Sequence, residues 1–406
     1  MAETQSTAAM LECAHNLARD FAETYQLRDK LGDFPHEEMA KLKKSGLLAA
    51  TVPAEYGGAW LPFADFIEIV MILAAANPSI AHNFIEHGVF TRELLMGTPN
   101  PALQREIYSA VVQNHASVSN AAAERGSPTV LKYATRFADD PTRKGVTING
   151  KKFFCTGAVC SDYLFVTGCY QDGYAFAWVP TKSPGVHVLD DWDAMGMRGT
   201  GSGSTQFKDA LIPRDWMVPI GKLDEKAPDP NSLFAPLFQN SFNAIYIGAA
   251  EGMLAFAVNY LKTKSRPYGA SGVATAAEDP YVLLDVGRMR SHLSAARAKV
   301  REAAAATDRA LSARGTVSAE EMARLRLDAM VQVSEAKVVA TDAALQIGND
   351  GFKICGARAT LTGEGLDKYL RDIRTLTLHD PVDYKARLVG EYVVTGNFYS
   401  YLPFYT

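Results

Sequence analysis

The segment TLTLHDPVDYK, residues 375–385, places His379 directly before Asp380 and a proline. A histidine can donate or accept a proton near neutral pH, because its unperturbed pKa is ~6.5. The neighbouring carboxylate could act as a base or hydrogen-bond to the imidazole. The residues alone leave two interpretations open: the acid–base centre of an enzyme, or a helix end that carries a solvated histidine.

The composition argues against several other kinds of function. The chain has 406 residues, enough for two or three domains and a large core. Its net charge of −4, with 21% charged residues, gives no strong field for nucleic acid. The apolar run IVMILAAA is far shorter than the roughly 20 residues that cross a bilayer, and the N-terminus lacks a signal-peptide pattern. We therefore expect neither nucleic acid nor a membrane as a partner.

The five cysteines are scattered along the chain and form no C-x-x-C pair. An odd, scattered set is typical of reduced thiols, which favours a cytoplasmic protein. No cysteine or histidine spacing of the zinc type is present, so the sequence predicts no metal site.

The elements that must position His379 fall into three regions. Apolar residues at three- and four-residue spacing predict an α-helical domain over 1–117. Short β-prone runs predict a β domain over 118–215, where Asn149-Gly150 is a hairpin signal. Long helical patterns over 216–406 predict a four-helix bundle, in which Gly248 and Gly252 suit close packing. The expected fold class is α+β.

The glycine-rich segment RGTGSGS, residues 198–204, lies inside the predicted β domain. It could cradle a phosphate or form a mobile turn. No G-x-G-x-x-G follows a strand and opens a helix, so a Rossmann nicotinamide site is not supported. Any NAD(P)H would have to be used by a separate protein.

Four segments, in this order along the chain, are similar to motifs of the acyl-CoA dehydrogenase superfamily of flavoproteins. They are SGLLAATVPAEYGG (45–58), DAMGMRGTGSGSTQFKDALIP (193–213), ALQIGNDGF (344–352), which resembles a turn, and YLRDIRT (369–375). The resemblance covers nearly the whole chain. It implies an N-terminal helical domain, a middle β-barrel domain, a C-terminal four-helix bundle and a homotetramer whose bundles meet at the centre.

Further segments resemble the two-component (group D) flavin-dependent monooxygenases of this superfamily, above all dibenzothiophene monooxygenase-like enzymes. They are SNAAAERGS (119–127), KKFFCTGA (151–158), WDAMGMRGTGSGS (192–204), CGARAT (355–360) and RTLTLHDPVDYK (374–385). The resemblance implies that an NAD(P)H-dependent flavin reductase supplies reduced flavin, FMN in preference to FAD. The flavin would react with O2 and, as a C4a-(hydro)peroxyflavin, oxygenate a small organic substrate at sulfur, nitrogen or aromatic carbon.

The same resemblance implies four catalytic residues. His379 would lie near flavin C4a, where a weak acid must hold or protonate the distal oxygen. Thr156 matches the hydroxyl near flavin N5, and Asn120 and His87 match an asparagine and a histidine near the flavin. His82, five residues before His87, is an alternative in this helix. Each type also has a structural use, as a packed strand threonine or a core histidine.

A partly overlapping set is implied for cofactor binding. Arg266 resembles the arginine that grips the flavin phosphate, often from a neighbouring subunit, and its planar fork suits phosphate; Lys264 is the alternative. Gln346 and Gly348 would line the same intersubunit site or simply turn the chain. The full set is Thr156, Cys155, Asn120, Arg266, Gln346 and Gly348, although strand alternation points Cys155 away from the face of Thr156.

A second chemistry within the superfamily is acyl-CoA dehydrogenation. Asp380 stands where a catalytic glutamate is usual, but a side chain one methylene shorter displaces a base by about 1 Å, which costs roughly 100-fold. The Thr-Glu-Pro turn of the dehydrogenases is missing, and alanines occupy 121–123. Leu376 replaces a second histidine of the dibenzothiophene group, so the polarity of the substrate pocket differs. The alternative function is therefore an acyl-CoA dehydrogenase-type oxidoreductase.

Overall fold

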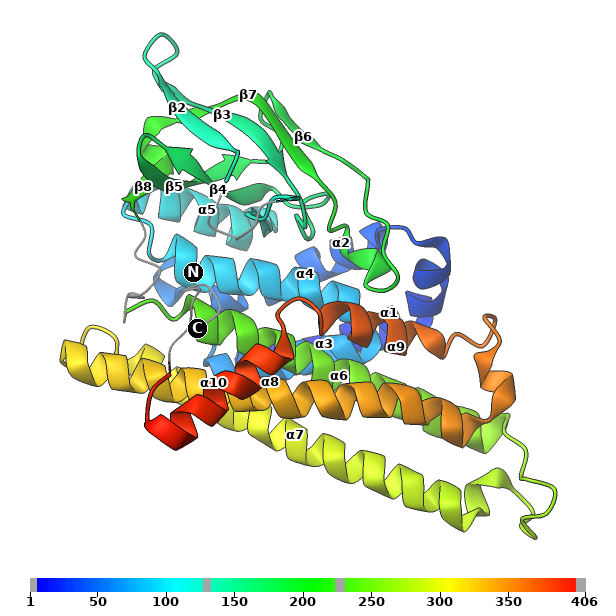
Figure 1. Cartoon of the computed structure of the whole chain (residues 1–406). Helices are drawn as coiled ribbons and strands as arrows, with labels where there is room; N and C mark the ends of the chain where they lie inside the picture. Colours follow the sequence, from blue (N-terminus) through cyan, green and yellow to red (C-terminus); the bar gives the residue numbers. More distant parts are fainter. Residues whose placement is uncertain (1–5, 127–132, 223–230, 399–406) are drawn as a thin grey trace.

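The computed structural model describes residues 6–126, 133–222 and 231–398, and these residues form three regions (Figure 1). Helices come first, a sheet follows, and long helices complete the chain. This order confirms the predicted α+β class and the predicted succession of helical, β and helical regions. Because β8 runs to Gly221, the sheet extends beyond the predicted boundary at residue 215.

Helix α4 is enclosed by α3, α6 and β1, and its residues are all buried. Asn77 caps this helix by accepting hydrogen bonds from the backbone N–H groups of Ser79 and Ile80. A π-helical turn, Phe90–Leu95, follows it directly. The bounds are Thr7–Leu31 (α1), His36–Lys44 (α2), Phe63–Ala76 (α3), Pro78–Val89 (α4) and Pro101–Asn114 (α5).

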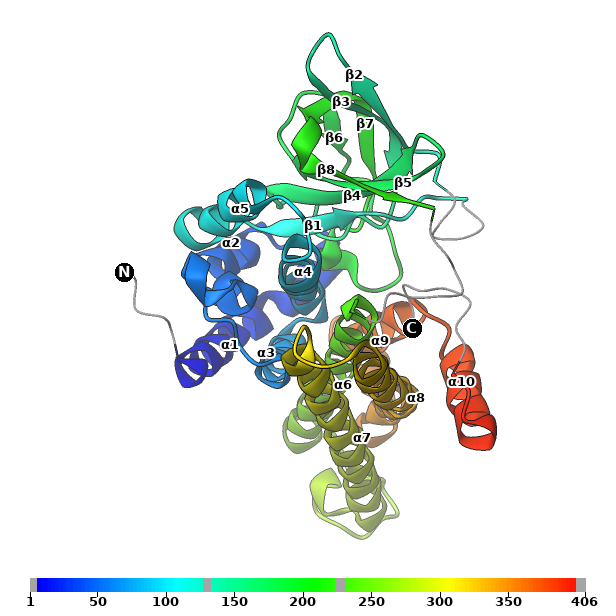
Figure 2. The same ribbon diagram turned by 90° about the vertical axis from the view of Figure 1, so that its left-hand side faces the viewer.

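The sheet runs in the order β6-β7-β3-β2-β4-β5-β8, and β1 pairs with β4 in parallel. Figure 2 shows this sheet above the helices, with β1 beside α4. The described strands are Val118–Ala121 (β1), Arg136–Asp140 (β2), Gly145–Lys152 (β3), Tyr163–Tyr170 (β4), Gly173–Pro180 (β5), Val186–Val188 (β6), Thr205–Pro213 (β7) and Met217–Gly221 (β8).

The hairpin predicted at Asn149-Gly150 is wrong, because both residues lie inside β3. The register of β3 against β7 shifts between Ile148 and Gly150, which marks a β-bulge. The Asn149 amide donates a 2.8 Å hydrogen bond to Asp209 of β7. The residues with turn chemistry thus serve a bulge between two strands that are distant in sequence.

The C-terminal helices form the bundle, with α6, α7 and α8 side by side and α9 between the bundle and the sheet (Figures 1 and 2). A Cβ atom on Gly252 of α6 would lie 2.2 Å from the Ala75 carbonyl oxygen of α3, which confirms the close packing expected there. The bounds are Phe234–Thr263 (α6), Pro280–Ala313 (α7), Ala319–Cys355 (α8), Asp367–Leu376 (α9) and Val382–Thr395 (α10).

Two helices of the bundle, α8 and α6, differ from simple expectations. Gln346 and Gly348 lie inside α8, so the turn expected there is not formed. Among the described helices, α6 alone has the length and composition to span a bilayer, but 72% of its most apolar stretch is buried within this structure, as in a core helix.

A buried carboxylate joins all three regions. Asp372 of α9 accepts hydrogen bonds from the Tyr25 hydroxyl of α1 and from the backbone N–H of Met197, in the loop before β7. The indole of Trp192 in turn donates to the Met197 carbonyl oxygen, at 3.0 Å. The loop that carries the RGTGSGS segment is therefore tied to the first and ninth helices.

Candidate active site

A cavity of about 720 Å³ lies where the sheet meets α4, α6 and the end of α9. Its wall is mostly aromatic, with polar side chains gathered on part of it. The polar group is His82, Glu86, Asn120, Thr156, Ser202 and His379, and the aromatic group includes Phe90, Phe153, Phe154, Phe165, Trp192, Phe234 and Phe238. The structure thus brings together three of the four predicted catalytic residues.

His379 lines the cavity, and its side chain is accessible there. Protein atoms surround the ring on its other sides, and desolvation lowers the pKa of His379 well below its ordinary value of 6.5. The positive charges of Lys337 and Lys385 lower it further. The imidazole is therefore neutral at neutral pH.

Behind His379 lies a buried ammonium group. Lys337 of α8 is fully buried and donates a 2.8 Å hydrogen bond to the Tyr246 hydroxyl. Tyr246 donates in turn to the Leu376 carbonyl oxygen at 3.2 Å, in the turn that leads to His379. Burial lowers the pKa of Lys337 to about 8.

Asp380 would be the catalytic base if the protein were an acyl-CoA dehydrogenase, but it does not line the cavity. Its carboxylate is buried and forms an ion pair of 3.2 Å with Lys385. This arrangement uses the carboxylate to hold the start of α10. It does not present a base to a substrate.

A second polar chain lies opposite, on α4 and β1. The Glu86 carboxylate accepts a 2.6 Å hydrogen bond from the Asn120 side-chain amide. Its other oxygen lies 3.3 Å from Nε2 of His82. Because the Asn120 nitrogen is held by Glu86, the carbonyl oxygen of the amide is left for a ligand. Glu86 was not among the predicted residues, although its spacing of four from His82 places both on one helix face.

His87, predicted as catalytic, does not reach the cavity. It is 1% exposed, its Nε2 lies 2.9 Å from the Leu48 carbonyl oxygen, and its Nδ1 accepts a 3.0 Å hydrogen bond from the Val118 N–H. Burial lowers the pKa of His87 to about 4. It is thus a neutral bridge between backbone segments, and His82 is the histidine of α4 that faces the cavity.

Thr156 reaches the cavity from the turn after β3. Its hydroxyl lies 2.8 Å from the Ser202 hydroxyl, which donates a 2.7 Å hydrogen bond to Thr200. The RGTGSGS segment therefore places its serine beside the predicted threonine. Cys155 points the other way, into the core of the sheet, and burial raises its thiol pKa to about 12. The direction is the predicted one, but both residues lie after the end of β3, so strand alternation is not its cause; it takes Cys155 out of reach of a ligand in the cavity.

The other predicted cofactor residues lie away from the cavity. Arg266 is exposed in the loop after α6, and Lys264 beside it pairs with Glu364 at 2.6 Å. Gln346 is exposed on α8 and lies 3.0 Å from Nδ1 of His292. Within one chain these groups cannot touch what the cavity holds, so their predicted role requires a neighbouring subunit.

The mouth of the cavity carries aromatic side chains. Phe154 is 55% exposed and has a positive φ of 56°, a conformation that costs about 1 kcal/mol or more in a bulky residue. Its ring lies 5.9 Å from that of Trp192, and the Arg125 guanidinium stacks 4.3 Å from the Phe153 centroid. This group offers flat apolar faces to a planar ligand.

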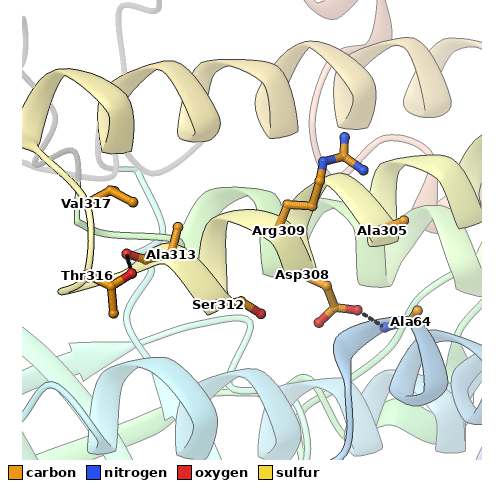
Figure 3. A pocket seen from close by; sticks show the side chains of 8 residues that line it. All are labelled: Ala64, Ala305, Asp308, Arg309, Ser312, Ala313, Thr316 and Val317. Carbon is orange, nitrogen blue, oxygen red and sulfur yellow. Dashed lines mark hydrogen bonds between the residues drawn. The ribbon is translucent and has the colours of Figure 1, made fainter.

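Another depression, near the C-terminal end of α7, offers no comparable chemistry (Figure 3). Asp308, the carboxylate in its wall, points to the start of α3 and accepts hydrogen bonds from the backbone N–H groups of Phe63 and Ala64. Arg309 pairs with Asp328 at 3.0 Å. The polar groups here are used within the fold.

The cavity fits a flavin ring system, which is planar, apolar on its faces and polar along its edges. Aromatic side chains supply the faces, and Thr156, Ser202 and Asn120 supply hydrogen-bonding groups. No cluster of metal-ligating side chains occurs within residues 6–126, 133–222 and 231–398.

Comparison with known proteins agrees with this geometry. Residues 4–114, 121–210 and 241–384 match the N-terminal, middle and C-terminal domain models of acyl-CoA dehydrogenase. A dibenzothiophene monooxygenase of Mycolicibacterium goodii is 35% identical over 96% of this chain and 94% of its own length. A "Probable FMNH2-dependent monooxygenase SfnC" of Pseudomonas putida is 30% identical over 96% and 97%.

The solved structure of FMN-bound TdsC from Paenibacillus sp. A11-2 superposes with a TM-score of 0.89, at 32% identity, over 98% of this chain and 100% of that one. Sequence and structure thus agree over nearly the full length of both proteins. The chain belongs to the acyl-CoA dehydrogenase family and, within it, to the flavin-dependent monooxygenases.

Proposed function

We propose that the chain is the oxygenase of a two-component system that receives FMNH2 from a separate NAD(P)H-dependent flavin reductase. In this proposal it transfers one atom of O2 to the sulfur of a small aromatic molecule. The other atom leaves as water, so that substrate, O2 and FMNH2 give oxygenated substrate, water and FMN. Supporting this, relatives carry the names of FMNH2-dependent and dibenzothiophene monooxygenases.

The observation that carries the proposal is the neutral His379 at an aromatic cavity with Thr156 and Asn120 in the same wall. Bound reduced flavin would supply the two electrons that activate O2. A ring nitrogen of His379 would hold the proton that the departing oxygen atom needs. Thr156 and Asn120 would orient the cofactor by hydrogen bonds, and the aromatic wall would exclude water.

His82 replaces His87 in this proposal, because His82 is the one that lines the cavity. The Asp380 carboxylate is engaged by Lys385, which speaks against proton abstraction from an acyl-CoA. Arg266, Gln346 and Gly348 are assigned to a phosphate site completed by a neighbouring subunit of a homotetramer. Exposed apolar side chains on α7 and α10, such as Tyr281 and Val394, support such an assembly. Cytoplasmic reductant would keep the free cysteines reduced.

The test starts from protein mixed anaerobically with chemically reduced FMN and benzothiophene. On admission of O2, we expect benzothiophene S-oxide with less hydrogen peroxide than free FMNH2 produces. If all electrons appear as peroxide with sulfur, nitrogen and aromatic carbon probes alike, the proposal fails. Anaerobic bleaching of bound oxidised flavin by an acyl-CoA would establish the dehydrogenase instead.

A further inference from the structure

Glu86 is a carboxylate among the polar side chains of a mostly aromatic cavity. It is 2% exposed and lies on α4, between the ring of His82 and the amide of Asn120. Each of its oxygens already has one neighbour, at 2.6 Å and 3.3 Å. A carboxylate has about four acceptor positions, so roughly two are left for a ligand in the cavity.

Among the described charged side chains that line the cavity, Glu86 is buried and has no lysine or arginine partner, whereas the ammonium of Lys337 lies behind His379 and does not line the cavity. Glu124 is neutralised by Lys152, at 2.7 Å, and also accepts from the backbone N–H groups of Ala134 and Thr135. The side chain of Asp193 is 96% exposed at the mouth, where water screens it. Among the described lining residues, Arg125 is the one with a permanent positive charge, and it lies over Phe153.

His82 does not change this balance. If its imidazole is neutral, no cation in the described lining of the cavity balances the charge of Glu86. If its imidazole is protonated, the pair with Glu86 is neutral, and the new charge is already used at 3.3 Å. In both states, no cation in this part of the described lining is available to pair with an anionic ligand. The Glu86 carboxylate, in contrast, is a buried acceptor for an N–H group of a ligand.

From this we infer that Glu86 is the specificity-determining residue of the cavity: it accepts a hydrogen bond from an N–H group of an aromatic substrate and excludes anionic substrates. The inference rests on the proposed function, because it assigns the cavity to the substrate as well as to the flavin. It narrows the substrates to neutral or cationic aromatic molecules, and among these it favours molecules with an N–H donor over molecules such as benzothiophene that lack one. Sulfinates, sulfonates and carboxylates are rejected.

The test measures binding without turnover, in protein that holds oxidised FMN. The probes are indole, 1-methylindole and indole-2-carboxylate, which differ in the N–H donor and in charge but share one ring system. We expect the wild-type protein to bind indole about tenfold more tightly than 1-methylindole, as one hydrogen bond to a charged group allows. The carboxylate should bind at least about 100-fold more weakly than indole, from repulsion at low dielectric.

The Glu86→Gln variant keeps the size of the side chain and removes its charge. We expect the discrimination against indole-2-carboxylate to shrink by about tenfold or more, and the preference for indole over 1-methylindole to shrink as well. Asp193→Asn is the matched control: it removes one negative charge at the solvent-exposed mouth, and both ratios should stay within about twofold.

The affinities of the wild-type protein for the three probes can overturn the inference by themselves. The inference can therefore be refuted even if the Glu86→Gln variant fails to fold. Equal affinity of the wild-type protein for indole and its carboxylate would contradict the assignment, as would unchanged ratios in Glu86→Gln. Because no turnover is involved, a protein that shows the expected order but oxygenates nothing would refute the proposed function and leave this inference standing.

Discussion

The ring of His379 lies against the ring of Phe242, with centroids 4.2 Å apart and planes inclined by 31°. The buried ammonium of Lys337 lies 6.0 Å from the centroid of the same phenyl ring. Phe242 therefore lies next to both His379 and Lys337, and the positive charge of Lys337 opposes protonation of His379. The neutral state of the histidine is built into the bundle as well as into the cavity.

The neutral state of His379 can be tested by titration. Because burial and Lys337 lower the pKa of His379, the imidazole should stay neutral as pH falls from 8 to 6.5. In Lys337→Met the pKa of His379 should rise towards its ordinary value, and protonation should begin at higher pH. NMR titration of the labelled imidazole measures both. Lys353→Met, on the exposed side of the same helix, should leave the titration unchanged; an unchanged titration in Lys337→Met would contradict the prediction.

Loss of the imidazole should uncouple oxygen consumption from product formation. In His379→Ala we expect FMN binding within a few-fold of wild type, and product per O2 lower by about 10- to 100-fold, the usual effect of losing a general acid or base. The missing electrons should appear as hydrogen peroxide. His187→Ala, on the exposed edge strand β6, controls for a histidine lost elsewhere. Wild-type coupling in His379→Ala would remove the role assigned to the residue.

The Thr156 hydroxyl should matter through its hydrogen bonds. Thr156→Val keeps the shape but removes the partner of Ser202, so FMN affinity should fall by about tenfold, as for one lost hydrogen bond. Thr156→Ser should retain affinity within about threefold. Fluorescence titration with FMN gives both constants. Equal affinity of the valine and serine variants would show that the hydroxyl does not contact the cofactor.

The stability of the protein should fall between pH 6.5 and pH 4. His87 has a native pKa of about 4, so in this window the unfolded chain binds more protons than the folded one. The contribution is fully present above pH 6.5 and is lost as pH falls towards 4, by up to about 3 kcal/mol. In His87→Gln, whose amide can also donate and accept, denaturant unfolding should depend less on pH. The same slope in both proteins would count against this account.

Arg266 provides a test of assembly. If it grips the flavin phosphate of a neighbouring subunit, Arg266→Gln should weaken FMN binding by about tenfold or more, as expected for a lost charge-assisted hydrogen bond. Lys264→Gln, which breaks the pair with Glu364, should have little effect. Light scattering run in parallel separates a lost contact from a lost tetramer. Wild-type affinity in an intact Arg266→Gln oligomer would exclude the phosphate role.

The helical and β regions could be predicted because apolar periodicity follows from one-sided burial. The same logic failed for α4, where every residue is buried and no apolar face indicates a direction. Choosing between His82 and His87 therefore required the positions of Glu86 and of the backbone at Val118. The choice depended on contacts that are distant in sequence.

Two turns predicted from local sequence, at Gly348 and at Asn149-Gly150, are not formed, for a related reason. Gly348 is tolerated within α8 because Leu370 of α9 approaches it, and a Cβ there would lie 3.0 Å from the leucine side chain. Asn149 and Gly150 serve a bulge whose partner is Asp209. In both cases a partner from another element, which no local pattern reports, decided the conformation.

The hydrogen bonds of Asp372 to Tyr25 and to Met197 constrain how such a protein can diverge. One carboxylate links the first helix, the loop around the cavity and the helix before His379. A first helix without the hydroxyl of Tyr25, or a ninth helix without the carboxylate of Asp372, would leave a buried acceptor or donor unmatched, whereas the backbone N–H at 197 does not depend on the side chain there. Chimaeras of this family should therefore take the first and ninth helices from the same parent.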